Sequence, residues 1–321
     1  MSTEGGTRAI VAALLANLGI AATKFLAFAL TSSSSMLAES IHSLADSGNQ
    51  GLLLLGGRRS RREADTEHPF GYGRERYIYA FIVAVVLFSV GGLFALYEGF
   101  HKVSHPEPID SWQWVPVVVL LVAIGLETFS FRTAIKESNH VRGRQTWVQF
   151  VRRAKAPELP VVLLEDVAAL LGLVFALFGV GLTIITGNSL FDAIGTLMIG
   201  TLLIIVAIVL GMETKSLLVG EGANDDDLQK IEQAILDGPE AERIIHMKTL
   251  YLGPDELLVA AKVGFAADQR LLEVATATNV IEARVRQAVP TARVIYVEAD
   301  VYVDPAAAAP ATDAIVIKGL E

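Results

Sequence analysis

Cysteine is absent from the 321 residues of this chain. The chain therefore contains no disulfide, no thiolate nucleophile and no thiolate metal ligand. Its first eight residues, Met-Ser-Thr-Glu-Gly-Gly-Thr-Arg, also lack the basic segment and the small-residue cleavage site that mark a secretory signal peptide. We therefore expect the apolar run that follows them to be retained as a helix.

Charged residues are scarce as well. They make up 19% of the chain, whereas hydrophobic residues make up 52%, and the mean hydropathy is +0.48. A soluble domain has about 25% charged residues, and here the apolar excess is concentrated in blocks, which is typical of a membrane protein with a soluble part. The net charge of −9 comes largely from the last third of the chain and argues against a nucleic-acid partner.

Six apolar segments approach the roughly 20 residues that a helix needs to span a bilayer. They cover about residues 8–30, 34–56, 77–99, 114–134, 160–185 and 189–212. The second is the weakest by hydropathy, and we include it because its polar residues recur with helical periodicity. The sequence thus predicts an integral membrane protein with an all-α six-helix bundle over residues 8–212.

Two loops between these segments are rich in basic residues. They carry Arg58, Arg59, Arg61, Arg62, Arg74 and Arg76 between the second and third segments, and Arg132, Lys136, Arg142, Arg144, Arg152, Arg153 and Lys155 between the fourth and fifth. The other connections are poor in Lys and Arg. By the positive-inside rule both basic loops are cytoplasmic, and with six spans the N- and C-termini are then cytoplasmic too.

The character of the sequence changes after the sixth segment. The predicted elements are a helix from Asp225, strands over 243–252 and 256–265, a helix from Asp268 to Ala288 and a strand over 292–303. The turn Gly253-Pro254-Asp255 separates the first two strands. This order predicts a small cytoplasmic α+β domain, ferredoxin-like α-β-β-α-β, over residues 213–303. We expect residues 304–321 to form a disordered tail.

The second apolar segment contains a polar stripe within Ser35–Asn49. Its members are Glu39, His42, Asp46 and Asn49, and their spacings of three, four and three residues place them on one face of a helix. Ionisable groups inside a membrane helix usually face the bundle interior or a water-filled path. His42 and Asp46 are also good ligands for a divalent transition metal, with Glu39 and Asn49 as weaker candidates, so the stripe predicts an intramembrane cation site.

One helix cannot surround an ion, and the best partners for the stripe are Glu165 and Asp166 in the fifth segment. Adjacent helical residues point about 100° apart, so the two carboxylates cannot face one neighbour equally well. His42, Asp46 and Asp166, with Glu165 or water as the fourth group, suit tetrahedral zinc; the three carboxylates and single imidazole also suit manganese or ferrous iron. Alternatively, these groups pair with Lys24 or with backbone groups and have only a structural role.

Three motifs carry a family resemblance. Asp65-x-x-His68-Pro-Phe-Gly-Tyr-Gly-Arg precedes the third segment, Ser35-x-x-Ala38-Glu39-x-x-His42-x-x-x-Asp46 lies in the second, and Lys215-Ser-Leu-Leu-Val-Gly-Glu ends the sixth. Together they resemble the cation diffusion facilitator family over about residues 8–303. The resemblance implies a homodimeric exporter of divalent cations, driven by proton antiport, with half of its transport site on the second helix.

The chain departs from the pattern of that family at three places. Val162 occupies the position, four residues before Asp166, at which the family usually has His or Asp, and Glu165 is the obvious substitute. His140 is the only histidine in the loop between the fourth and fifth segments, and His246 the only one in the tail domain, so we expect little metal binding there. His68 either binds an interfacial ion, as in some relatives, or structures its loop.

The leading hypothesis is a proton-coupled metal exporter that favours zinc and needs no other cofactor. Metal binding requires a neutral imidazole and ionised carboxylates and therefore displaces protons, a role that suits His42 because imidazole has an ordinary pKa near 6.5. The alternative is a non-transporting metal sensor or membrane scaffold with a degraded site. A third possibility, an intramembrane metallohydrolase, is disfavoured because six histidines are few for a catalytic zinc site.

Overall fold

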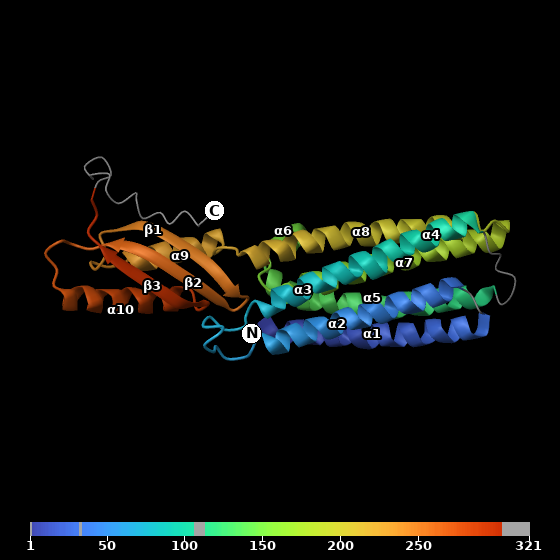
Figure 1. Cartoon of the computed structure of the whole chain (residues 1–321), viewed down its shortest axis with the longest axis horizontal. Helices are drawn as coiled ribbons and strands as arrows, with labels where there is room; N and C mark the ends of the chain where they lie inside the picture. Colours follow the sequence, from blue (N-terminus) through green and yellow to red (C-terminus); the bar gives the residue numbers. More distant parts are fainter. Residues whose placement is uncertain (1, 32–33, 106–112, 304–321) are drawn as a thin grey trace. The chain divides into compact units, whose positions relative to one another are not determined.

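The computed structural model describes residues 2–31, 34–105 and 113–303 (Figure 1). The chain divides into two compact units: the first runs to Gly220 and also takes in Leu252–Pro254, and the second comprises the rest of the chain from Glu221. The predicted disordered tail, 304–321, lies outside the described residues.

The first unit consists of long helices that run alongside one another (Figure 1). They are α1 (Ser2–Thr31), α2 (Ser34–Arg59), α3 (Glu75–Val86), the π-helical turn η1 (Leu87–Leu93), α4 (Phe94–Ser104), α5 (Trp114–Arg142), the short α6 (Trp147–Arg153), α7 (Glu158–Thr186) and α8 (Leu190–Val219). Because α3, η1 and α4 follow one another without a break, they form one helical segment, Glu75–Ser104.

Within the described residues, four helical segments are long and apolar enough to cross a membrane, which confirms a helical transmembrane region. They are Glu75–Ser104, α5, α7 and α8. In the described part of α1 the apolar stretch is shorter, Ala13–Leu26, and in α2 the polar stripe lowers the hydropathy. Membrane crossing by α1 and α2 therefore stays a prediction.

Small residues allow α8 to approach its neighbours closely. A Cβ atom added to Gly92 of η1 would lie 2.5 Å from Cγ1 of Ile204, and one added to Gly99 of α4 would lie 2.7 Å from Cδ2 of Leu197. Glycine is enriched at membrane helix interfaces for this reason, since van der Waals packing drives association where lipid is as apolar as the side chains. This packing sets the position of α8 beside the η1–α4 segment.

The second unit has the predicted α-β-β-α-β order. Its elements are α9 (Asp225–Leu236), β1 (Arg243–Gly253), β2 (Glu256–Gly264), α10 (Leu271–Ala288) and β3 (Ala292–Asp300). The sheet order is β1-β2-β3. The strands β2 and β3 are parallel, with Val259 opposite Ile295, whereas β1 and β2 are joined by a tight turn, which requires an antiparallel pair.

One face of this sheet is buried under the two helices. Alternate residues of β2 from Leu257 to Val263 are buried, as expected when one face of a strand is covered and the other is not. They share an apolar core with Ile231 and Ile235 of α9 and with Ile281 and Val285 of α10. The small α+β domain is thus built around a single core of its own.

The start of α10 differs from the prediction. The helix begins at Leu271, with Arg270 as its N-cap residue, and Asp268 lies in the preceding turn. The carboxylate of Glu273 accepts a hydrogen bond of 2.8 Å from the backbone N–H of Arg270. Because Glu273 supplies this contact, as in a capping box, the helix does not need Asp268 as a cap.

The loop between α2 and α3 is organised by Asp65. Its Oδ1 accepts hydrogen bonds from the backbone N–H groups of Glu67 (3.1 Å) and His68 (2.7 Å), and its Oδ2 accepts one from the Tyr72 hydroxyl (2.6 Å). The guanidinium of Arg62 lies 4.1 Å from the centroid of the Tyr72 ring. The hydrogen bonds, that from Tyr72 first, hold the pKa of Asp65 below its ordinary value.

We expect Ile281→Ala to lower the free energy of unfolding of the second unit by about 2–5 kcal/mol, because a fully buried aliphatic side chain is removed and a cavity is left. Amide hydrogen exchange of β2 and α10 in the whole chain measures this change. Leu272→Ala on the same helix is the matched control: Leu272 is 78% exposed, and its loss should change the value by no more than about 0.5 kcal/mol. Equal effects of the two substitutions would contradict the described core.

We expect Asp65→Ala to accelerate amide exchange of residues 65–72 several-fold at neutral pH, because the loop loses all three hydrogen bonds. Since the pKa of Asp65 is lowered, this stabilisation is fully present above the carboxyl's unfolded value, about 3.9, and is lost as the pH falls through the lower folded value. The difference from wild type should therefore vanish only in acid. Glu67→Ala serves as the control, and a difference that persists at the lowest pH would count against this account.

Candidate functional site

Two adjacent carboxylates of α7 lie buried between other helices. Glu165 accepts hydrogen bonds from the side-chain amides of Asn49 (to Oε1, 2.8 Å) and Gln50 (to Oε2, 3.0 Å), both on α2. Asp166 accepts one of 3.0 Å on Oδ2 from the hydroxyl of Ser130 on α5. The two carboxylates therefore face different helices, as the helical rotation of about 100° per residue requires.

The polar contacts continue from α2 to α1. The side-chain amide of Asn17 donates to Oε1 of Gln50 at 3.3 Å, so Asn17, Gln50 and Glu165 form a buried chain across α1, α2 and α7. An amide can donate and accept at once, which makes such a chain possible. Further along α1, Nζ of Lys24 donates to Oγ of Ser43 at 3.0 Å. The interior of the bundle is thus polar between α1 and α2, from Asn17 to Lys24.

Two more carboxylates belong to this interior. Asp46 of α2 and Glu127 of α5 are 7% and 4% exposed, and both interact electrostatically with Glu165 and Asp166. Glu127 lies three residues before Ser130, on the same face of α5. Within the described part of the chain its Oε2 has no hydrogen-bond partner. We call Asp46, Glu127, Glu165 and Asp166 the carboxylate cluster.

The cluster has a clear chemical consequence. Like charges at low dielectric repel one another strongly, and Lys24, which interacts electrostatically with Glu127, is the one cation among the groups named here. A buried acidic cluster of this kind can be stabilised by protons or by a bound cation, and oxygen ligands suit divalent ions. The four carboxylates of the cluster are therefore groups on which protons or a divalent cation would relieve the repulsion between like charges.

The predicted ligands are only partly visible. The side chains of His42 and Glu39 lie outside the described residues, so the metal set that includes them stays a prediction. Among the side chains that are described, no three His, Asp or Glu residues lie close enough to hold a metal ion. Val162 is completely buried in the apolar core, and Asn49, a weaker candidate ligand, is hydrogen bonded to Glu165.

His68 lies away from this cluster, in the loop organised by Asp65. Its side chain is 52% exposed, and its Nδ1 lies 3.5 Å from Oδ1 of Asp65. Its ring centroid lies 4.4 Å from that of Tyr72. These contacts support the loop-structuring interpretation of His68, and its binding of an interfacial ion stays a prediction.

Sequence reasoning did not place Asn17, Gln50, Ser130 or Glu127 at the cation site. All four are buried polar residues inside apolar helices, which is the signal that could have identified them. The spacing of Glu127 and Ser130 also places both on one helix face. Which carboxylate each residue meets depends on the packing of the helices, and the sequence does not contain that information directly.

The sequence of this chain is similar to those of known cation transporters. Residues 10–219 match the family model described as the cation efflux transmembrane domain. The mitochondrial proton-coupled zinc antiporter SLC30A9 of Homo sapiens is 35% identical over 244 residues, which are 75% of this chain and 43% of that protein. Metal tolerance protein C4 of Arabidopsis thaliana is 30% identical over 267 residues, 83% of this chain and 58% of that protein.

A bacterial relative is matched over more of its length. The cation-efflux pump FieF of Yersinia enterocolitica is 26% identical over 245 residues, 73% of each chain. By contrast, the chain spans about half the length of the eukaryotic relatives. The family model covers most of the helical unit, including every member of the carboxylate cluster. This chain therefore belongs to the cation efflux family, a family of transporters and not of enzymes.

Proposed function

We propose that this protein exports a divalent cation across a membrane in exchange for protons, with zinc as the favoured ion and manganese or ferrous iron as further candidates. The observation that carries the proposal is the carboxylate cluster, in which four acidic side chains lie buried in apolar helices and interact electrostatically. Intramembrane acidic groups mark ion and proton pathways. The relative SLC30A9 is a proton-coupled zinc antiporter, which supports the same proposal.

We place the cation between α2 and α7. Its proposed ligands are His42, Asp46 and Asp166, with Glu165 or water completing the set and Glu39 or Asn49 as weaker candidates. Because both oxygens of Glu165 accept hydrogen bonds from amides, this carboxylate would have to exchange at least one of them for the metal. Neutral imidazole and ionised carboxylates bind the ion, so binding displaces protons, and protonation of His42 favours release.

The proposed architecture is a homodimer with six spans and cytoplasmic termini. The second helix, α2, has 26 residues and is about 39 Å long at 1.5 Å per residue, which exceeds the roughly 30 Å of a bilayer core. The helix α1 has 30 residues. These lengths support two spans in addition to the four that hydropathy identifies. With six spans and both basic loops in the cytoplasm, the N-terminus and the C-terminus both lie in the cytoplasm.

The alternative function is a non-transporting metal sensor or membrane scaffold. It is favoured by one observation: both oxygens of Glu165 and one of Asp166 accept hydrogen bonds from neutral side chains, as expected if these groups only join helices.

The exporter and the sensor differ in whether zinc drives proton movement across the membrane. In proteoliposomes loaded with a pH-sensitive dye, an exporter gives zinc-dependent proton flux, whereas a folded dimer without such flux would favour the sensor.

We expect Asp46→Ala and Asp166→Ala each to reduce zinc transport in proteoliposomes by tenfold or more, because each removes a charged ligand from a site that has few. Glu98→Gln is the matched control: Glu98 lies on α4, an element that contributes nothing to the carboxylate cluster, and its neutralisation should leave transport within about twofold. Normal transport by either aspartate variant would overturn the assignment of the site.

The role of Glu165 has a test of its own. If Glu165 is a ligand, Glu165→Ala should raise the apparent KM for zinc about tenfold, whereas Asn17→Ala, which disturbs the same buried amide chain without removing a carboxylate, should not. Transport of zinc, manganese, iron and cadmium by both variants measures this difference. Equal effects of the two substitutions would assign Glu165 to helix packing alone.

A further inference from the structure

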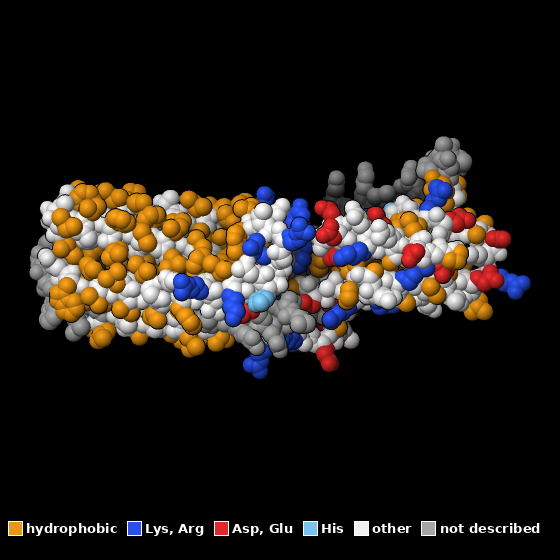
Figure 2. All heavy atoms as spheres, turned by 180° about the vertical axis from the view of Figure 1, so that it is seen from behind, with side chains coloured by type: hydrophobic (Ala, Val, Ile, Leu, Met, Phe, Trp, Pro, Cys, Tyr) orange, Lys and Arg blue, Asp and Glu red, His pale blue; other side chains and the backbone are white. Residues whose placement is uncertain are grey.

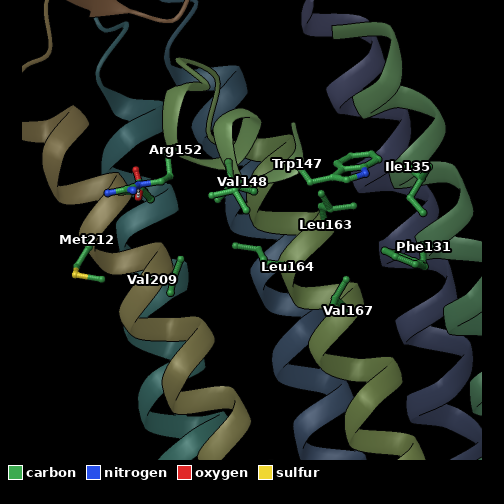
Figure 3. Close-up of a pocket in the computed structure, with 12 residues that line it drawn as sticks. Phe131, Ile135, Trp147, Val148, Arg152, Leu163, Leu164, Val167, Val209 and Met212 are labelled. Atoms are coloured by element: carbon green, nitrogen blue, oxygen red, sulfur yellow. Dashed lines mark ion pairs between the residues drawn. The ribbon is translucent and has the colours of Figure 1, made fainter. Parts of the chain in front are cut away.

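An apolar groove of about 620 Å³ lies between α5, α6, α7 and α8 (Figure 3). Its walls include Phe131 of α5, Leu164 and Val167 of α7, and Val209 of α8. On α7, Leu164 and Val167 lie on the side of the helix opposite Glu165 and Asp166, because three residues bring a helix almost one turn around. The groove is therefore separate from the carboxylate cluster.

The mouth of the groove is formed by the short helix α6. Thr146 caps this helix in a capping box with Gln149, and the buried side chain of Phe150 anchors it to the bundle. Trp147 lines the groove, and the guanidinium of Arg142 lies 4.2 Å from the centroid of its ring. Tryptophan and arginine at the end of an apolar helical region are typical of the level of lipid headgroups.

Two arginines of α6 lie at or next to one edge of the groove. Arg152 lines it and extends outward with a side chain that is 72% exposed, and its contact with Glu213 is long, at 3.7 Å. Arg153 follows, also exposed, so the last turn of α6 presents two guanidinium groups against one carboxylate. Figure 2 likewise shows Lys and Arg side chains gathered toward one end of the hydrophobic surface of the helical unit.

We propose that this groove binds an anionic phospholipid, with an acyl chain between α5, α7 and α8 and the headgroup phosphate beside Arg152 and Arg153. The occupant must match apolar walls and a cationic edge, and a phospholipid of net negative charge matches both. The helices α5, α7 and α8 are long and apolar enough to cross a membrane, so acyl chains surround the groove. Guanidinium groups bind phosphate with charge-assisted hydrogen bonds.

Tryptophan fluorescence tests this proposal on the full chain. The chain has three tryptophans, and Trp112→Phe with Trp114→Phe leaves Trp147 as the single reporter. We reconstitute this variant in vesicles that contain brominated phosphatidylglycerol or, separately, brominated phosphatidylcholine at the same mole fraction. We expect the anionic lipid to quench Trp147 with a relative binding constant about 25-fold above that of the zwitterionic lipid, from about fivefold for each of the two arginines near the phosphate.

Three variants separate the groove from general attraction to a charged surface. Arg152→Gln with Arg153→Gln should reduce the preference to about one, whereas Arg61→Gln, which removes a charge from the other basic loop, should leave it unchanged. Val167→Phe narrows the groove and should weaken quenching by both lipids. Quenching that is equal for the two lipids, or a preference that survives the double substitution, would overturn the proposal. So would quenching by neither lipid, and a disulfide between two copies that each carry Val148→Cys would then show that a second copy covers the groove.

Discussion

The helical unit depends on one constraint: acidic side chains inside apolar helices need partners. Both members of the pair Glu165–Asp166 have such partners: Glu165 accepts hydrogen bonds from two side-chain amides of α2, and Asp166 accepts one from a hydroxyl of α5. The Asn17–Gln50 contact extends the same polar layer to α1. Buried polar groups without such contacts destabilise a protein by several kcal/mol in lipid, so these hydrogen bonds determine which faces of α1, α2, α5 and α7 turn inward.

The same layer gives Glu165 two possible roles. Its amide contacts stabilise the helix packing, yet its carboxylate also interacts electrostatically with Asp46 and Asp166. A cation that enters the cluster would relieve repulsion among these groups and could replace one amide at Glu165. Val162 cannot supply a ligand, because its side chain has no oxygen or nitrogen atom and is buried in the apolar core. Any ion held here is therefore bound mainly by oxygen atoms and by very few imidazoles.

Sequence reasoning could predict those parts of the structure that follow from local pattern. Long apolar runs predicted the four spans that the structure supports, and the turn at Gly253–Asp255 predicted the β1–β2 hairpin. The start of α10 was wrong because Asp268 and Arg270 both precede a plausible first turn, and the contact of Glu273 selects the later one. The partners of Glu165 could not be predicted, because a contact between residues more than a hundred positions apart depends on how whole helices pack. The role of His42 stays a prediction.

The central claim is that His42, Asp46 and Asp166, with Glu165 or water, bind the transported cation. X-ray absorption spectroscopy at the zinc edge tests this claim most directly on the zinc-loaded protein in detergent or bilayer. The account predicts a first coordination shell of oxygen atoms with one imidazole nitrogen, and the loss of bound zinc when Asp46 and Asp166 are both replaced by alanine. A shell made mainly of histidine nitrogen, or zinc that remains bound in the double variant, would contradict the account.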